Sequence, residues 1–205
     1  MTDFLFSPYK NVSLLQIILE ALTFIFGIAS VYFAKKENIW VYPTGLIATV
    51  ITVYLMYKAA YFGDMTINFY FSVMSIYGWY KWSKKTVDNQ ALPISRTNCK
   101  EKIIGIVLFF ITVIIIFIIY KIFDYNIRFI NYCDIFTSGL FFTAMWYMAL
   151  KKIENWTLWI IGDLIAVPLY WYKGLGILAL EYVIFTLLAV LAYIEWKKIL
   201  HNNLQ

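Results

Sequence analysis

Long uninterrupted apolar runs restrict the fold of this sequence more than any other feature. Each run covers roughly 17–23 residues, the length that a helix needs to cross a hydrocarbon layer about 30 Å thick. With 62% hydrophobic and 14% charged residues, the 205-residue chain has too little polar surface for a soluble domain. Within lipid, a helix satisfies all of its own backbone hydrogen bonds. We therefore expect an all-α integral membrane protein.

The apolar runs predict seven transmembrane helices within a single membrane domain, residues 1–205. The first run is too long for the apolar region of a signal peptide, so we expect it to remain in the protein. The longest polar loop, 83–102, is the one plausible linker. The predicted helices are 13–34, 39–57, 64–82, 103–122, 134–150, 156–172 and 175–196.

Lysine and arginine divide unevenly between the two ends of these helices. Cytoplasmic loops carry the excess of positive charge, so the richer end is expected to face the cytoplasm, with the N-terminus outside and the C-terminus inside. The charges are spread over short loops and form no patch that predicts a nucleic-acid partner. One group is Lys35, Lys36, Lys81, Lys84, Lys85, Arg96, Lys100, Lys102, Lys151, Lys152, Lys197 and Lys198, and the other is Lys10, Lys58, Lys121, Arg128 and Lys173.

The sequence repeats itself on the two sides of the polar loop. KKENIWVYPTGLIATVITVYLMYK (35–58) resembles KKIENWTLWIIGDLIAVPLYWYK (151–173). IYGWYKWSKK (76–85) likewise resembles AYIEWKK (192–198) at the end of the next helix. A different interpretation is that Lys-Lys-Glu-Asn is a common helix-end sequence that occurs twice by chance.

A repeat of this kind predicts the topology. Three helices leave the chain on the opposite side of the membrane, so a fourth lets the second triplet enter in the same direction as the first. We therefore expect two parallel three-helix repeats, 13–82 and 134–196, joined by a linking helix, 103–122. In transporters with such repeats the substrate site lies near mid-membrane between the halves.

The stretch ENWTLWIIGD (154–163) contains the main candidate binding residues. Trp156, Trp159 and Asp163 are spaced so that they share one helix face. An aspartate within a membrane span is costly unless it faces the protein interior and has a partner. Tryptophan faces attract cations, so this face suits a flat, positively charged or amino-bearing ring. Alternatively, the tryptophans belong to the interfacial aromatic belt and Asp163 pairs with another helix.

Few other polar residues lie at membrane depth. Asn68, Glu181 and Glu20 are candidate ligand contacts if they converge on one cavity, and interhelical hydrogen bonds if they do not. Trp79 and Trp82, at the end of their helix, are more typical of an aromatic belt than of a site.

Three of these motifs resemble the Pnu-type vitamin transporters, the PnuC family. ENWTLWIIGD resembles the family signature Trp-x-x-Trp-x-x-x-Asn, and ALEYVIFTLLA and IYGWYKWSKK resemble segments of two other helices. The resemblance implies seven helices arranged as in full-length SWEET sugar transporters, assembled as a homotrimer in the bacterial inner membrane. It also implies facilitated diffusion of an unphosphorylated vitamin that a cytoplasmic kinase then traps.

The resemblance also assigns roles to single residues. Trp156 and Trp159 would stack on the vitamin ring, Asn68 would be a polar ligand, and Asp163 replaces the signature asparagine. An ionised aspartate only accepts hydrogen bonds, whereas an amide also donates them. This departure suits thiamine, which the sister group PnuT carries, while the breadth of the family favours nicotinamide riboside. Both substrates stay open, with nicotinamide riboside first.

Ion coupling and catalysis are the remaining alternatives. Glu20, Asp163 and Glu181 have no basic residue at the same predicted depth, which favours uniport over ion symport. An intramembrane enzyme would need a grouped nucleophile, base and usually a metal. The chain has no HExxH or GxSxG motif, its only histidine is His201, and Cys99 and Cys133 stand apart from other metal ligands. We therefore expect no enzymatic activity and no cofactor.

Overall fold

The computed structural model describes residues 13–58, 62–84, 91–123, 127–172 and 176–202. Within these segments the chain forms seven α-helices, which confirms the prediction of an all-α fold with seven spans. The helices are α2 (Leu14–Lys35), α3 (Val41–Lys58), α4 (Phe62–Ser83), α5 (Cys99–Phe123), α6 (Phe129–Ala149), α7 (Glu154–Tyr172) and α8 (Gly176–Asn202).

The helix ends extend beyond the predicted spans where polar residues cap them. At the start of α5 the Asn98 side chain accepts a hydrogen bond from the Glu101 amide (2.9 Å), and the Glu101 carboxylate accepts one from the Asn98 amide (2.8 Å). This capping box begins the helix before its apolar run. Apolar run length alone therefore placed the start of α5 too late.

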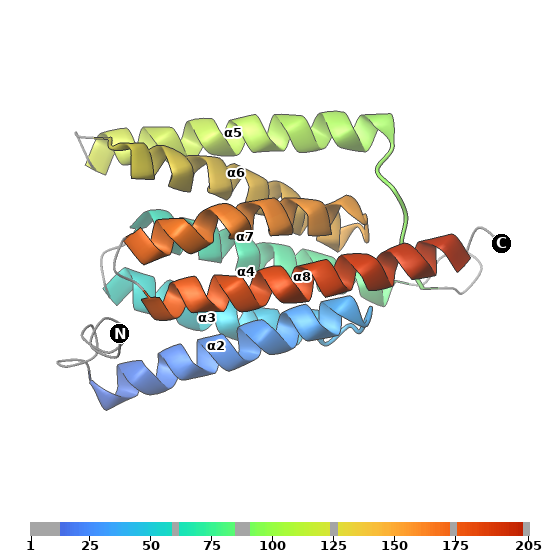
Figure 1. Ribbon diagram of the computed structural model, residues 1–205, viewed down its shortest axis with the longest axis horizontal. Helices are drawn as coiled ribbons and strands as arrows, with labels where there is room; N and C mark the ends of the chain where they lie inside the picture. Colours follow the sequence, from blue (N-terminus) through green and yellow to red (C-terminus); the bar gives the residue numbers. More distant parts are fainter. Residues whose placement is uncertain (1–12, 59–61, 85–90, 124–126, 173–175, 203–205) are drawn as a thin grey trace.

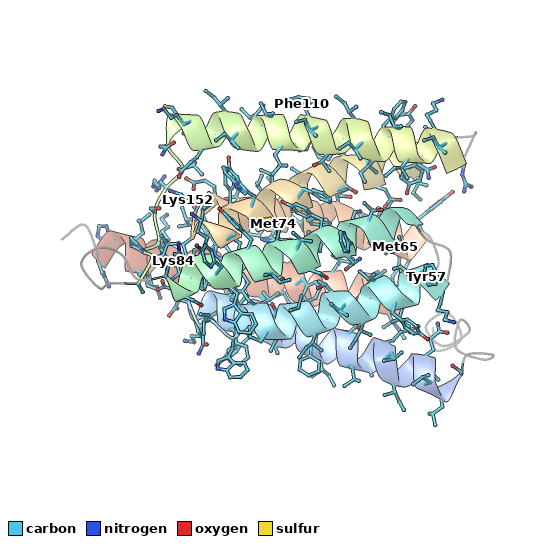
Figure 2. All side chains as sticks on the ribbon, turned by 180° about the vertical axis from the view of Figure 1, so that it is seen from behind. Tyr57, Met65, Met74, Lys84, Phe110 and Lys152 are labelled. Carbon is cyan, nitrogen blue, oxygen red and sulfur yellow. The ribbon has the colours of Figure 1, made fainter. Side chains whose placement is uncertain are left out.

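The surface of the bundle has the apolar character of a membrane protein. Three helices, α2, α5 and α8, are long and apolar enough by themselves to cross a membrane. Large apolar side chains of α5 point away from the bundle along its whole length, among them Ile103, Phe110 and Ile118. Figure 2 shows Phe110 on this outer face. The inner helices contain more polar residues because they are shielded by protein: α6, for example, buries Thr137, Ser138 and Thr143.

The helices pack as two sets of three with α5 at one edge (Figure 1). In the first set α3 packs against both α2 and α4, and in the second α7 packs against both α6 and α8. The two sets meet where α2 contacts α8 and where α4 contacts α6. Helix α5 packs on α6 and touches α4 only slightly. The arrangement is compatible with two repeats and a linking helix, which stays a prediction.

One end of the bundle, where α2, α4 and α6 end and α3, α5 and α7 begin, is called the basic end here. Lys84 and Lys152 lie at this end in Figure 2, and Tyr57 and Met65 lie at the other. Most of the described lysine and arginine residues lie at the basic end, whereas Lys58, Lys121 and Arg128 lie at the opposite one. Lys10, Lys85 and Lys173 are outside the described residues.

The corners between α2 and α3 and between α6 and α7 have the same backbone geometry. Glu37 and Lys151 both adopt the left-handed conformation, with φ of 53° and 51°. In each corner the amide of the next residue donates a hydrogen bond to a carbonyl near the end of the preceding helix. Asn38 donates to Phe33 and Lys152 donates to Tyr147, both at 2.9 Å. Non-glycine residues adopt this conformation at a cost of about 1–2 kcal/mol. By backbone conformation Glu37 therefore corresponds to Lys151. The shared Lys-Lys pairs instead align Lys35 with Lys151, which differs by two positions.

The linker before α5 is fastened to the second corner. Ser95 and Lys152 form an isolated parallel bridge, with the Ser95 amide donating to the Lys151 carbonyl (3.1 Å) and the Ile153 amide to the Ser95 carbonyl (3.0 Å). The Lys152 ammonium also pairs with the Glu101 carboxylate at 2.8 Å. These contacts hold the start of α5 against the corner that precedes α7.

Candidate functional site

Trp159 and Asp163 lie inside the bundle on α7, as the spacing of the motif predicts. The Trp159 ring stacks on Phe141 of α6, with centroids 5.2 Å apart and planes 26° apart, and it lies 5.9 Å from the Phe71 ring of α4. Its indole nitrogen is buried and has no hydrogen-bond partner among the described residues. Aromatic side chains of α4 and α6 thus contact the ring of a tryptophan whose N–H donor is unused.

The Asp163 carboxylate is the most unusual group in this region. The residue is 2% exposed, so it faces the protein interior and not lipid. No hydrogen bond or ion pair joins it to another described residue. A buried carboxylate without donors is strongly disfavoured unless a ligand or water supplies them. Asp163 is therefore the group in this site with the greatest need of a partner.

Gly162 allows the aromatic packing beside Asp163. A methyl group at this position would collide with the Phe141 ring. The glycine therefore lets Phe141 approach the α7 backbone closely enough to stack on Trp159, one turn away. The spacing of Trp156, Trp159 and Asp163 predicted this site, and the part played by Gly162 is visible only in the packing.

Trp156 lies in different surroundings from Trp159. It is 1% exposed, packs into the core of the basic end and meets Trp196 of α8 edge to face at 5.4 Å. Its indole nitrogen is also buried and unpartnered within the described part of the chain. The two tryptophans share a helix face, but the structure does not bring their rings together. A direct stacking role for Trp156 stays a prediction.

Helix α8 adds aromatic residues that sequence reasoning missed. Tyr182 lies parallel to Phe141 at 6.2 Å and to Tyr170 of α7 at 5.0 Å. Trp159, Phe141, Tyr182 and Tyr170 thus form a continuous row, called the aromatic row below. Phe141 and Tyr170 belong to no recognisable motif, so only the three-dimensional packing reveals their part in it.

The three other predicted site residues lie on separate helices. Glu181 faces Gly27 of α2, where its carboxylate oxygen lies 3.7 Å from the position that a Cβ would take. Glu20 accepts a hydrogen bond from the Gln16 side chain at 3.0 Å in an exposed position. Asn68 is half-buried on α4, and its carbonyl accepts a hydrogen bond from the Ser72 hydroxyl at 3.0 Å. No described contact joins any of the three to Asp163.

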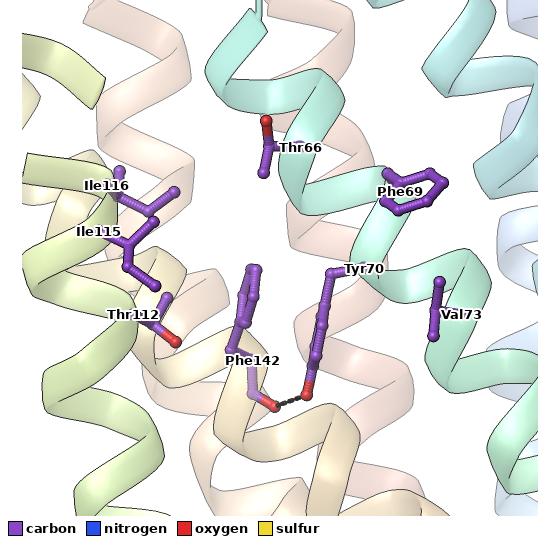
Figure 3. Close-up of a pocket in the computed structure, with 8 residues that line it drawn as sticks. All are labelled: Thr66, Phe69, Tyr70, Val73, Thr112, Ile115, Ile116 and Phe142. Atoms are coloured by element: carbon purple, nitrogen blue, oxygen red, sulfur yellow. Dashed lines mark hydrogen bonds between the residues drawn. The ribbon is translucent and has the colours of Figure 1, made fainter. Parts of the chain in front are cut away.

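A cavity of about 330 Å³ lies elsewhere, between α4, α5 and α6 (Figure 3). Tyr70 and Phe142 stack at 3.8 Å on one side of it, with the Tyr70 hydroxyl donating to the Phe142 carbonyl at 3.0 Å. Its lining is almost entirely apolar and includes none of the six predicted site residues. A binding site for a polar vitamin needs several convergent polar groups, so we do not assign the substrate to this cavity.

The histidine and cysteine side chains of the described segments lie apart from one another. These segments contain no group of three histidine, cysteine, aspartate or glutamate side chains that could hold a metal ion. His201 is exposed near the end of α8, and Cys99 is exposed at the start of α5.

Comparisons with known proteins agree with this arrangement. Residues 17–198 match the family model described as nicotinamide mononucleotide transporter. The nicotinamide riboside transporters PnuC of Escherichia coli (strain K12) and of Shigella flexneri are each 26% identical over 195 residues, covering 84% of this chain and 82% of theirs. A solved structure, the crystal structure of the vitamin B3 transporter PnuC, has the same fold, with a TM-score of 0.72 at 20% identity over 98% of this chain and 86% of that one.

The family match covers most of the chain, including all seven helices. The relatives are transporters, which agrees with the prediction that the protein is not an enzyme. With its apolar surface and its fold, the protein is a multi-pass membrane transporter, and it belongs to the nicotinamide mononucleotide transporter family.

Proposed function

We propose that the protein carries nicotinamide riboside across a bacterial inner membrane by facilitated diffusion, and that a cytoplasmic kinase then traps the vitamin. The two relatives named as nicotinamide riboside transporters support this substrate. The ligand is a flat aromatic cation with a carboxamide, and the site around Trp159 suits both features. The aromatic row supplies π faces for the cation, and Asp163 supplies acceptors for the amide protons.

The unpartnered Asp163 carboxylate is the observation that carries this proposal. Asp163 is buried one turn along α7 from Trp159, whose ring contacts Phe141 and Phe71, and a negative charge there attracts a cation that brings its own hydrogen-bond donors. The Trp159 N–H, which is also unused, is available to an oxygen of the same ligand. An anion would be repelled by Asp163, and an uncharged sugar would donate hydrogen bonds to it without balancing its charge.

Thiamine is the second candidate, favoured by one residue. Its aminopyrimidine donates hydrogen bonds and its thiazolium is cationic, so it too fits a carboxylate at position 163 in place of the family's asparagine. The relatives favour nicotinamide riboside over thiamine. The two vitamins differ in whether an asparagine at position 163 would also serve them, which makes the choice testable.

The pairing of the described charged side chains supports uniport. Among the described residues no lysine or arginine pairs with Asp163 to form the charge cluster that a symporter usually needs. Lys151, a deeply buried lysine, is already paired with Glu37 at the basic end. We propose that no ion gradient drives uptake and that phosphorylation by the kinase makes it effectively one-way.

We further propose that the basic end faces the cytoplasm, with the N-terminus outside, and that the protein assembles as a homotrimer. The excess of positive charge at that end supports the orientation. The homotrimer comes from the family resemblance alone, and the mass of the protein in detergent tests it. The two repeats, 13–82 and 134–196, with 103–122 as the linking helix, belong to the same proposal. The matching corners at Glu37 and Lys151 support them.

Uptake by sealed proteoliposomes tests the function. Radiolabelled nicotinamide riboside should enter down its gradient and stop at equal concentrations on both sides, and an imposed proton or sodium gradient should not change that end point. Thiamine should compete weakly. Accumulation above equilibrium without a kinase would contradict uniport, and uptake of thiamine alone would replace the substrate.

The variant Asp163→Asn separates the two vitamins. It restores the family's signature residue, so nicotinamide riboside uptake should stay within about threefold of wild type, whereas a thiamine carrier should lose most of its uptake because the acceptor charge is gone. Trp40→Phe is the control, since Trp40 is exposed and does not belong to the aromatic row.

A further inference from the structure

The basic end contains a set of residues related by a constant shift of 114 positions. Glu37 corresponds to Lys151, Tyr42 to Trp156 and Trp82 to Trp196. The packing is matched as well as the numbering. Tyr42 meets Trp82 edge to face at 5.1 Å and 86°, and Trp156 meets Trp196 edge to face at 5.4 Å and 87°. The two triplets of helices thus place equivalent side chains in equivalent contacts.

Equivalent residues from the two halves also contact one another. The Lys151 ammonium and the Glu37 carboxylate lie 3.0 Å apart, with side chains 6% and 27% exposed. Trp82 and Trp196 lie 6.3 Å apart. Residues that are exchanged by a twofold relation can touch each other only near its axis. These two pairs therefore mark the axis between the halves at the basic end.

We call Glu37, Lys151, Tyr42, Trp82, Trp156 and Trp196 together the axial seal. Tyr42, Trp156 and Trp196 are almost completely buried. Lys151 connects the ion pair to the aromatic residues, since its ammonium also lies 4.5 Å from the centroid of the Trp82 ring. A partly buried ion pair next to packed rings thus lies between the two halves at the basic end.

The seal is not fully symmetric, and the difference indicates where it can part. The Trp196 indole donates to the Ala34 carbonyl at 3.1 Å, which ties α8 to α2. The equivalent Trp82 nitrogen is buried without a partner among the described residues. Trp82 is held instead by Lys151. Movement of Lys151 away from both Glu37 and Trp82 would therefore free α4 from the second half while leaving the contact between α8 and α2 in place.

We propose that the Glu37–Lys151 pair is the latch of a gate at the basic end, and that the axial seal parts there to release the substrate in each transport cycle. The proposal rests on the transport function proposed above and adds the residues that control release. Alternating access requires an element with two stable states. An ion pair between the two halves is such an element, because it can break and re-form.

Thiol labelling tests the latch without any vitamin. Ser75 is buried on α4, two turns further inside than Trp82 and on the same face. In a background with Cys99→Ser and Cys133→Ser, Ser75→Cys supplies a nearly isosteric reporter. A membrane-impermeant maleimide is added in turn to inside-out and right-side-out vesicles. With the seal intact, labelling should be slow from both sides.

Neutral variants of the latch should open the path. Glu37→Gln and Lys151→Gln should each raise the labelling rate at least tenfold, from the side of the basic end alone. The double variant E37K/K151E should return the labelling rate to within about threefold of the rate with the latch intact, because each side chain takes the place of its symmetric counterpart. Lys151→Arg, which keeps the charge, should give an intermediate rate and keeps the test valid if a neutral variant does not fold.

The control is the exposed pair Lys36–Glu195, 3.9 Å apart with side chains 50% and 38% exposed. Lys36→Gln should leave labelling unchanged. Equal labelling in all latch variants, or an equal rise in Lys36→Gln, would overturn the proposal. Because no vitamin is used, loss of uptake with normal labelling behaviour would count against the substrate and not against the latch.

Discussion

The middle of α7 and its beginning form opposite kinds of environment, although one short motif supplies both. Around Trp159 and Asp163 a buried carboxylate has no described protein partner, and a glycine makes room for stacked rings. Around Trp156 the space is filled by Trp196 and by the side chains of the basic end. The first environment is suited to a ligand and the second to closure. The residues proposed to bind the vitamin, Trp159 and Asp163, thus lie one and two helical turns from Trp156 in the proposed gate.

The largest contrast should come from removing each tryptophan in turn. Trp156→Ala should destabilise the protein by about 3–5 kcal/mol, because it leaves a large cavity in a closed core. Trp159→Ala should cost less stability and abolish most of the vitamin binding. Thermal unfolding in detergent and a binding titration measure the two effects. Similar losses of stability and of affinity in both variants would end the distinction between the two regions.

Asp163→Ala should weaken vitamin binding by a factor of roughly 10–100, the range expected for hydrogen bonds to a charged group. The same change should leave the melting temperature equal or higher, because it removes a buried carboxylate that has no protein partner. Isothermal titration and thermal unfolding give both values. A marked loss of stability without loss of affinity would mean that Asp163 is structural.

Gly162→Ala should have a smaller effect on both properties. The added methyl group collides with Phe141 and displaces it from Trp159, at a cost of about 1–3 kcal/mol for overpacking. Affinity should fall because the aromatic row loses its order. Ala166→Gly, at a buried position one turn further along α7, changes the helix without touching this contact and serves as the control. An unchanged affinity in Gly162→Ala would show that the stacking does not shape the site.

The smallest effect should come from Glu20→Gln. Its carboxylate pairs with Gln16 in an exposed position, where such a contact is worth no more than about 0.5 kcal/mol. Glu181→Gln is the informative comparison, since Glu181 faces Gly27 across the contact between α2 and α8. Uptake assays of the two variants decide which glutamate belongs to the site. A strong loss in Glu20→Gln would place the site nearer the opposite end of the bundle.

The sequence predicts the helices well because each must supply its own hydrogen bonds across a fixed thickness. It also predicts that Asp163 faces inward, since a carboxylate facing lipid would be prohibitively costly. It separates Trp156 from Trp159 poorly, because a shared helix face does not reveal what lies opposite each residue. Phe141, Tyr182 and the seal residue Trp82 were missed or assigned to a membrane belt for the same reason. Their roles depend on contacts between distant helices.

The proposed repeat illustrates the limit of aligning two segments by shared residue types. The shared Lys-Lys pairs suggested one alignment, while backbone conformation and edge-to-face ring contacts give another, shifted by two positions. Only the second brings Glu37 opposite Lys151.

The most direct test of the account is a tryptophan fluorescence titration of the purified protein with nicotinamide riboside, compared between wild type, Trp159→Phe and Trp156→Phe. A ring that stacks in the candidate site should quench Trp159. The account predicts that the quenching is largely lost in Trp159→Phe and kept in Trp156→Phe. Quenching that survives in Trp159→Phe and disappears in Trp156→Phe would contradict it and would move the binding site to the basic end.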